Sequence, residues 1–301
     1  MSRRWLITGC SRGIGRALSQ AVLDAGHRLV ATAREPAQLA NLAERYGDAV
    51  RATALDVTDP VAAQAAVRLA VENFGGLDVL VNNAGYGNVN SVEDTELDDF
   101  REQIETNLFG TIIMTKAAIP VMREQRSGHI IQFSSVGGRI GAPGRAPYSA
   151  AKWGVEGFSE VLSQEMALIG VKVTVIEPGG FRTDFAGSST VLKEGRPEYD
   201  EIVGATARLQ RSYNNRQPGD PARAARVILE IAAMEQPPFR LPLGSDAVKI
   251  IEQVELKNLN ELERWRELSA TTDFPPKGDA AAGSAQGDSE ASPFLSLRPP
   301  R

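Results

Sequence analysis

Short apolar segments of strand length alternate along this chain with longer segments of helical periodicity. Apolar residues recur about every 3.6 positions between the apolar segments, over 14–25, 61–74, 97–125 and 149–169. Strands that are apolar on both faces and alternate with helices form a parallel sheet covered on both sides. The expected strands are 5–7, 29–33, 50–55, 77–81, 130–133, 171–176 and 239–243. The sequence therefore predicts an α/β fold with a Rossmann-type doubly wound parallel sheet of about seven strands, flanked by helices on both faces.

The C-terminal third adds three features to this pattern. Residues 181–219 are polar and weakly periodic, and a loop of that length in a compact domain is typically either a lid over a site or disordered. Asp220 followed by Pro221 indicates a helix start, and a further helix is expected from Asp246 to about Leu268. From residue 271 the chain is rich in Pro, Gly, Ala and Ser. We expect one domain over 1–270, with 181–219 as a substrate lid, and a disordered tail over 271–301.

Charge and composition exclude several classes of function. The net charge of −5 argues against a nucleic-acid-binding surface. No apolar run is long enough to span a membrane, and the apolar run at the N-terminus is too short for a signal peptide. A single cysteine, Cys10, allows no disulfide within the chain and, with only two histidines, disfavours a zinc site. We expect a cytoplasmic protein that works without a protein-bound metal.

A glycine-rich turn follows the first expected strand. Thr8-Gly-Cys-Ser-Arg-Gly13-Ile-Gly15 leads directly into a helical segment, in the spacing G-x-x-x-G-x-G. Glycines at such a turn let the backbone approach a pyrophosphate, whose charge the helix N-terminus receives. The same glycines would also serve a tight strand–helix turn without a ligand. Their place at the end of the first strand of a βαβ series favours a dinucleotide site.

Arginines rather than a carboxylate stand where a dinucleotide site selects its cofactor. An acidic residue at the end of the second strand favours NAD, whereas an arginine accommodates the 2′-phosphate of NADP. Arg34 ends that strand here, and Arg12 lies in the glycine loop. Glu35 is the competing NAD-type acid, but Pro36 after it places Glu35 at the start of the next helix, where a negative charge suits the helix dipole. The sequence favours NADP(H) and leaves NAD(H) open.

Tyr148 and Lys152 form the strongest catalytic candidate. Spaced four apart, they lie on one face of a helix, and an ammonium near a phenol lowers the phenol pKa. Such a pair can move a proton near neutral pH. Ser135 could direct its hydroxyl to the same substrate oxygen, with Ser134 as the competing hydroxyl, since neighbouring strand residues face opposite sides.

Taken together, these motifs resemble the short-chain dehydrogenase/reductase family in its standard single-domain branch, over about residues 4–245. Thr8 to Gly15 resembles the cofactor loop of the family, and Pro178-Gly179 with Thr183 resembles its segment over the nicotinamide. Asn107, Ser135, Tyr148 and Lys152 match its catalytic positions. The resemblance implies a cofactor site of Gly9, Ser11, Arg12, Gly13, Ile14, Gly15, Arg34, Asp56, Val57, Asn83, Ala84, Gly85, Tyr148, Lys152, Pro178, Gly179 and Thr183.

The family resemblance also implies a mechanism. Tyr148 would be the general acid in carbonyl reduction or the base in alcohol oxidation. Lys152 would lower its pKa and hold the nicotinamide ribose, and Ser135 would orient the substrate oxygen. Asn107 would support a water that connects Lys152 to solvent. Hydride transfer itself belongs to the cofactor.

The C-terminal segment departs from many members of the family. Residues 237–247 replace the strand that commonly supports tetramers, and a helix follows them. This end is more similar to members related to hydroxysteroid and retinol dehydrogenases, so a tetramer is in doubt. A homodimer through the helices that include Leu97 and Ser149 is compatible with the sequence.

Two functions remain open from the sequence. The first is an NADP(H)-dependent oxidoreductase that interconverts a small-molecule carbonyl and a secondary or primary alcohol. The alternative is a catalytically silent NADP(H)-binding sensor on the same fold. Such sensors typically lose the tyrosine or the lysine, whereas this chain keeps both, and the oxidoreductase is therefore favoured. The identity of the substrate is not encoded in any motif.

Overall fold

A computed structural model describes residues 2–187 and 190–274 of the chain. Its sheet contains β1 (Arg4–Ile7), β2 (Arg28–Ala33), β3 (Val50–Ala54), β4 (Val79–Asn82), β5 (Gly128–Phe133), β6 (Val171–Pro178) and β7 (Arg240–Leu243). The strand order is β3-β2-β1-β4-β5-β6-β7, and every neighbouring pair is parallel. The predicted doubly wound sheet is confirmed, and the order reverses direction between β1 and β4. In sheets of this kind ligands bind at such a reversal, outside the carboxyl ends of the strands.

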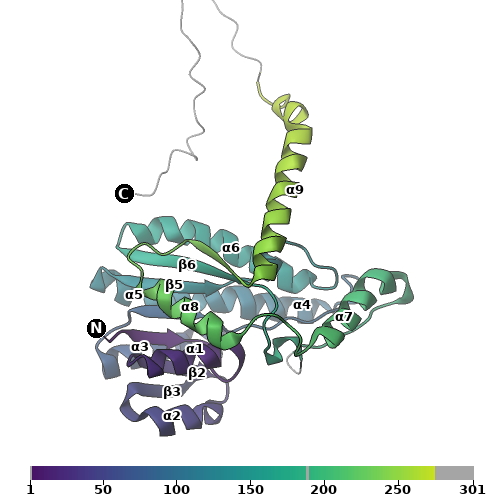
Figure 1. The fold of residues 1–301 in the computed structure, drawn as a ribbon. Helices are drawn as coiled ribbons and strands as arrows, with labels where there is room; N and C mark the ends of the chain where they lie inside the picture. The colour runs from purple at the N-terminus through teal and green to yellow at the C-terminus, as the bar shows by residue number, and fades with distance from the viewer. Residues whose placement is uncertain (1, 188–189, 275–301) are drawn as a thin grey trace, which may run out of the picture. The chain divides into compact units, whose positions relative to one another are not determined.

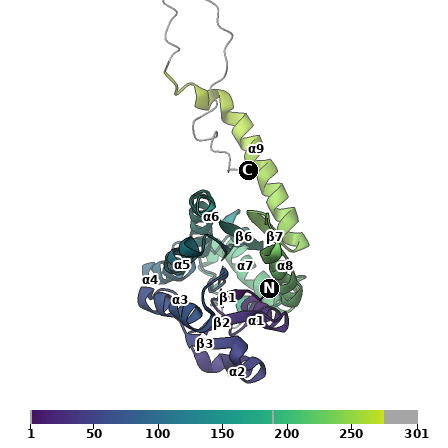
Figure 2. The ribbon, with the colours of Figure 1, turned by 90° about the vertical axis from the view of Figure 1, so that its left-hand side faces the viewer.

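Helices cover both faces of this sheet (Figure 1; Figure 2). On one face lie α1 (Gly13–Asp24), α8 (Pro221–Ala233) and the short α2 (Ala40–Tyr46). On the other lie α3 (Pro60–Phe74), α5 (Gly110–Gln125) and α6 (Ala146–Ala167). Asp59 and Asp220 cap α3 and α8 by accepting hydrogen bonds from backbone N–H groups of the first turn, and a proline follows each cap. The cap residues therefore fix where these helices begin.

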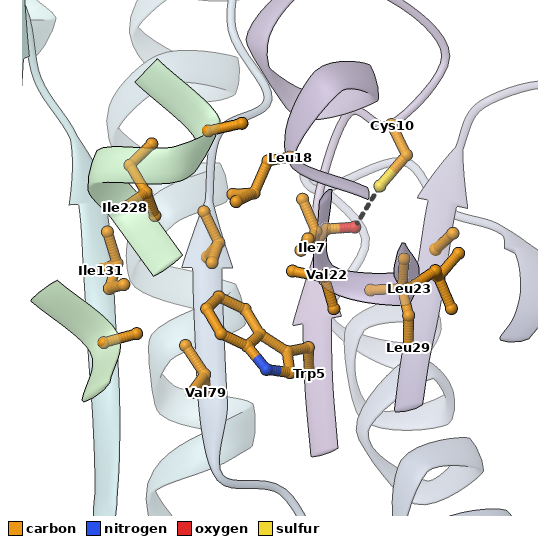
Figure 3. Packing of buried hydrophobic residues seen from close by; sticks show 14 of the residues in the cluster. Trp5, Ile7, Cys10, Leu18, Val22, Leu23, Leu29, Val79, Ile131 and Ile228 are labelled. Carbon is orange, nitrogen blue, oxygen red and sulfur yellow. Dashed lines mark hydrogen bonds between the residues drawn. The ribbon is translucent and has the colours of Figure 1, made fainter. Parts of the chain in front are cut away.

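The first face of the sheet has a core of large apolar side chains (Figure 3). Trp5 and Ile7 of β1 are buried against Leu18 and Val22 of α1, and Ile228 of α8 joins the same cluster. Burial of side chains of this size stabilises the fold by about 1.5–3 kcal/mol each. The cluster holds α1 against β1, which positions the loop that connects them.

The predicted helix over 97–125 is interrupted in the structure. It consists of α4 (Leu97–Ile104), a π-helical segment η3 (Glu105–Phe109) and α5. Wider π-type turns occur mostly as single-turn bulges and frequently at functional sites. Asn107 lies within this bulge and is fully buried. Periodicity alone did not show the break, because one extra residue in a turn shifts the apolar pattern only slightly.

The polar segment 181–219 contains more structure than its sequence pattern suggested. Short segments η5 (Asp184–Ala186), η6 (Pro197–Tyr199) and η7 (Asp200–Gly204) precede a helix, α7 (Ala205–Tyr213). Within α7 only Ala207 and Gln210 are buried. The helix was missed because its contacts with the domain involve too few apolar residues to produce a clear period.

Residue contacts divide the chain into two units, 1–251 and 252–301. The boundary falls inside α9 (Ser245–Ala270), earlier than the end of the single domain expected over 1–270. The second unit, where described, is the remainder of α9 and a turn, with Trp265 donating to Glu261 one turn away at 2.7 Å. Of the predicted tail, residues 275–301 lie outside the described residues. None of the helices in the described ranges is long and apolar enough to cross a membrane.

Cys10 is expected to be chemically inert in the folded protein. It is fully buried, and its thiol donates a hydrogen bond to the carbonyl of Ile7 at 3.0 Å. Burial raises the pKa of the thiol to about 11, so at pH 8 about 0.1% is thiolate, the reactive form. With Ellman's reagent we expect release of one equivalent per chain only after denaturation in guanidinium chloride. Stoichiometric release from the folded protein would contradict this placement.

Candidate active site

A cavity of about 660 Å³ lies at the carboxyl ends of the strands. Residues that follow β1, β2, β3, β4, β5 and β6 line it, together with the start of α6 and part of α7. The segments named by the sequence motifs therefore meet in one place. Of the predicted residues, those that line the cavity are Gly9, Ser11, Arg12, Gly13, Ile14, Arg34, Asp56, Val57, Asn83, Ala84, Gly85, Asn107, Ser135, Tyr148, Lys152, Pro178, Gly179 and Thr183.

Gly15 does not line the cavity but packs behind the loop. A Cβ at this position would lie 2.3 Å from the carbonyl oxygen of Gly9 and 2.4 Å from Nδ2 of Asn83. No side chain fits there, so the glycine permits close approach of α1 to the loop after β1. Gly9 and Gly13 have φ of +72° and +60°, which strongly favour glycine. The loop thus presents its backbone and the N-terminus of α1 to the cavity.

The loop after β4 supports the glycine loop. Oγ1 of Thr8 accepts hydrogen bonds from the backbone N–H groups of Asn83 and Ala84, each at 3.0 Å. The side-chain amide of Asn83 donates to the carbonyls of Thr8 and Gly9 at 2.9 and 3.1 Å. These hydrogen bonds therefore hold together the loop after β1 and the loop after β4, which lie on either side of the strand-order reversal.

The cationic side of the cavity lies at the end of β2. Arg12 and Arg34 are exposed and line the cavity, and neither is in an ion pair within the described part of the chain. Glu35 does not line the cavity; it precedes the short 3-10 helix η1 (Pro36–Leu39), and its carboxylate accepts from Gln38 at 3.1 Å. Positive charge therefore faces the cavity where the sequence placed the cofactor-selecting residues.

Tyr148, Ser135 and Lys152 come together where β5 ends and α6 begins. The Ser135 hydroxyl accepts from the backbone N–H of Gly137 at 3.0 Å. A Cβ at Gly137 would lie 3.1 Å from the Tyr148 ring and 3.6 Å from Oγ of Ser135, so these two side chains lie close together. Nζ of Lys152 lies 5.8 Å from the centroid of the Tyr148 ring and donates to the carbonyl of Phe133 at 2.7 Å. Ser134 is buried, and its hydroxyl has no hydrogen-bond partner among the described residues. Ser135, rather than its neighbour, thus lies beside the tyrosine.

The electrostatics of this group differ from the expectation. The pKa of Tyr148 is raised, because burial of the phenolate outweighs the effects of the nearby Ser135 hydroxyl and of the Arg145 charge, both of which lower the pKa. The Tyr–Lys spacing had instead predicted that Lys152 lowers the Tyr148 pKa. Burial instead lowers the pKa of Lys152 itself to about 8, against the opposing charge of Glu156. Desolvation of two buried groups, which no residue spacing encodes, is the physical reason.

Asn107 holds the loop that follows β4. Its Oδ1 accepts from the backbone N–H of Tyr86 at 3.1 Å, and its Nδ2 donates to the carbonyls of Tyr86 and Gln103 at 2.8 and 2.7 Å. A Cβ at Gly85 would lie 2.5 Å from Oδ1 of Asn107 and 3.6 Å from Nζ of Lys152. The space between Asn107 and Lys152 is therefore open only because residue 85 is a glycine.

The loop after β6 forms the remaining wall. The backbone N–H of Gly180 donates to Asp246 at 2.7 Å, and Thr183 lies against Gly13, where a Cβ would be 3.4 Å from its side chain. The Phe185 ring packs near that of Tyr148, with ring centroids 5.7 Å apart. Pro178, Gly179 and Thr183 line the cavity together with the glycine loop.

Two residues of the cavity, Arg145 at the start of α6 and Gln210 of α7, were not predicted from the sequence. Arg145 immediately precedes α6, and its guanidinium carbon lies 5.8 Å from the centroid of the Tyr148 ring. Gln210 of α7 accepts a hydrogen bond from Arg145 and also lines the cavity. No local motif marks either residue, because their meeting depends on a segment more than sixty positions away.

Comparison with known proteins gives consistent matches. The model of the short chain dehydrogenase family matches residues 3–192. "Oxidoreductase BOA17" of Botryotinia fuckeliana is 46% identical, over 89% of this chain and 98% of that protein. The crystal structure of a short-chain dehydrogenase from Streptomyces avermitilis has a TM-score of 0.85 and 39% identity, over 91% of this chain and all of that one. A serine dehydrogenase structure complexed with NADP+ has a TM-score of 0.68 and 27% identity, over 79% and 93% of the two chains.

The ammonium of Lys152 is expected to titrate near pH 8. In the full-length protein with ¹³C-labelled lysine, its Cε resonance, assigned by its loss in Lys152→Gln, should shift with a midpoint of about 8. A folded pKa below the unfolded one means that the unfolded chain binds more protons above pH 8. The Lys152 contribution to stability therefore rises with pH from about 8 until the unfolded lysine has also titrated. A midpoint above pH 10 would show that the ammonium is not desolvated.

Proposed function

This chain belongs to the short-chain dehydrogenase family. We propose that it is an NADP(H)-dependent oxidoreductase that interconverts a carbonyl and a secondary or primary alcohol. Membership makes it an oxidoreductase that uses a nicotinamide dinucleotide. One observation carries the finer proposal: Tyr148, with Ser135 beside it, lines the same cavity as the glycine loop. A proton donor and a dinucleotide cradle thus share one enclosed space.

The residues fit a bound dinucleotide. The glycine loop exposes backbone N–H groups and a helix N-terminus, where Cβ atoms would obstruct approach, and this suits a pyrophosphate. Asp56 and Val57 line the cavity after β3, where the family binds adenine, and Lys152 lies where it would hold the ribose of the nicotinamide. When bound, the nicotinamide would supply or accept the hydride.

Tyr148 acts as the general acid in carbonyl reduction. Because its pKa is raised, the phenol is protonated at neutral pH and can donate to a carbonyl oxygen that Ser135 orients. The positive charge of Arg145 beside the ring would stabilise the phenolate that remains. In the oxidative direction the same phenolate would act as the base. The protonated resting phenol favours reduction.

Asn107 and Gly85 would support the return of a proton from solvent, through Lys152, to the Tyr148 phenolate. The open space between Oδ1 of Asn107 and Nζ of Lys152 suits a water that accepts from the ammonium and donates to the amide oxygen. We propose this water as the link between Lys152 and solvent. Asn107 acts as a positioning residue, because its other hydrogen bonds hold the backbone of Tyr86.

Two arginines favour NADP(H) over NAD(H). Arg12 and Arg34 line the cavity at the end of β2, and a 2′-phosphate there would meet two guanidinium groups. Glu35, the competing acid, is hydrogen-bonded to Gln38 and does not line the cavity.

We propose the 181–219 segment as the substrate lid, since Phe185, Leu209 and Tyr213 of this segment line the cavity.

Replacing Tyr148 by phenylalanine should lower turnover by about 10²-fold or more, because the positioned general acid is lost. Turnover is measured by the absorbance of NADPH against a panel of ketones, aldehydes and alcohols, and NADPH binding by fluorescence. Binding should remain close to that of the wild type. Tyr46→Phe, which removes a hydroxyl that donates to Asp24 outside the cavity, is the matched control. Unchanged turnover in Tyr148→Phe would refute the assignment; NADPH binding by a wild type that turns over nothing would favour the silent sensor.

Replacing Arg34 by aspartate should shift cofactor preference toward NAD(H). The substitution removes a cation from the proposed phosphate site and adds an acceptor for a ribose hydroxyl. We expect the ratio of the NADPH and NADH dissociation constants to change by about 10-fold or more, as for loss of a charge-assisted hydrogen bond. Arg68→Asp, on the exposed face of α3, gives the same charge change away from the cavity. An unchanged ratio would show that Arg34 does not contact the phosphate.

A further inference from the structure

Arg145 is a half-buried cation without a carboxylate partner in the described part of the chain. Other half-buried arginines do have one: Arg4 pairs with Asp78, Arg139 with Glu177, and Arg240 with Glu156. A cation that is removed from water without a counterion costs free energy, and an anion that binds beside it offsets that cost. Burial accordingly lowers the pKa of Arg145, with only the Tyr148 phenolate opposing that effect.

Gln210 adds a second unsatisfied donor beside this cation. Its Oε1 accepts from Arg145, and because a guanidinium can only donate, this contact fixes the orientation of the amide. The Nε2 group is then left buried without a hydrogen-bond partner among the described residues, on a side chain only 9% exposed. Buried amide donors are usually satisfied, so the unpaired Nε2 indicates an acceptor that comes from outside the chain.

Both groups stand in the cavity on one side of the catalytic tyrosine. Arg145 precedes the first turn of α6, whereas Lys152 lies one turn beyond Tyr148, and each has its charged end 5.8 Å from the ring centroid. The glycine loop and Lys152 belong to the proposed cofactor site. Arg145 and Gln210 therefore face the part of the cavity that is left for the substrate, near apolar Phe185 and Leu209.

We propose that Arg145 and Gln210 form a carboxylate-binding subsite, so that the substrate is an oxo acid, or the corresponding hydroxy acid, with a hydrocarbon chain. This inference rests on the proposed function, since it names the substrate class of the same site. The planar guanidinium matches a carboxylate, and the amide Nε2 supplies a further donor. Phe185 and Leu209 offer an apolar wall for the hydrocarbon part.

The test compares acids with their uncharged esters. Purified full-length protein is assayed with 4-oxopentanoate and 5-oxohexanoate and with the methyl ester of each. In Arg145→Met, the ratio of kcat/KM for acid to that for ester should fall by about 10- to 100-fold, as for loss of a charge-assisted hydrogen bond. The ratio cancels any effect of Arg145 on the Tyr148 pKa, which acts on both substrates alike.

Two further variants separate charge from structure. Arg145→Lys keeps the cation and should restore part of the acid preference, whereas Arg68→Met, at an exposed arginine of α3 outside the cavity, should leave the ratio unchanged. If Arg145 only anchors α7 through Gln210, acid and ester rates will fall together and the ratio will stay constant, which overturns the proposal. Turnover of the esters in that case leaves the proposed oxidoreductase function standing.

Binding decides the question if no substrate of the panel is turned over. The dissociation constants of the two acids are measured by calorimetry for the wild type, Arg145→Met and Arg145→Lys, each saturated with NADP+. Weakening by about 10-fold in Arg145→Met, with recovery in Arg145→Lys, supports the subsite even though the proposed reaction has failed. Equal binding in all three proteins, or binding in none, overturns it.

Discussion

The hydrogen bond from the Lys152 ammonium to the carbonyl of Phe133 holds α6 against the sheet. It joins α6 to the last residue of β5 at 2.7 Å, inside the protein. Ser135 lies just beyond β5, and Tyr148 lies one turn before Lys152 on α6. The hydrogen bond between Lys152 and Phe133 therefore helps to set the distance between Ser135 and Tyr148. Burying the charged ammonium costs folding free energy, and burial accordingly lowers the pKa of Lys152. The charge is nevertheless buried here, at a position that lines the cavity.

The site depends equally on places where side chains are absent. Gly15 allows α1 to approach the loop after β1, and Gly85 leaves open the space between Asn107 and Lys152. Gly15 supports the proposed dinucleotide site, whereas Gly85 borders the proposed path of the proton. Their shared role is to let backbone and polar groups approach each other closely, which an alanine would prevent.

Positive charge is distributed through the cavity in three separate places. Arg12 and Arg34 lie at the end of β2, Lys152 beside the tyrosine, and Arg145 at the start of α6. We propose that these bind the cofactor phosphate, the cofactor ribose and the substrate carboxylate in turn. Within the described part of the chain, Arg12, Arg34 and Arg145 have no ion-pair partner, so a phosphate and a carboxylate suit this cavity although the net charge of the chain is negative.

Local patterns in the sequence determined the strands, their parallel arrangement and the motifs that meet at the cavity. Apolar period and the Gly, Tyr and Lys spacings act over a few residues, and a parallel sheet brings the ends of its strands together whatever the loops contain. The tertiary structure alone decided the π-bulge at Asn107, the place of Gly15 behind the loop, and the direction of the Tyr148 pKa. It also brought Arg145 to Gln210, with no carboxylate among the described residues paired to that guanidinium. Desolvation and the pairing of charges depend on which distant segments pack together, and no short stretch of sequence carries that information.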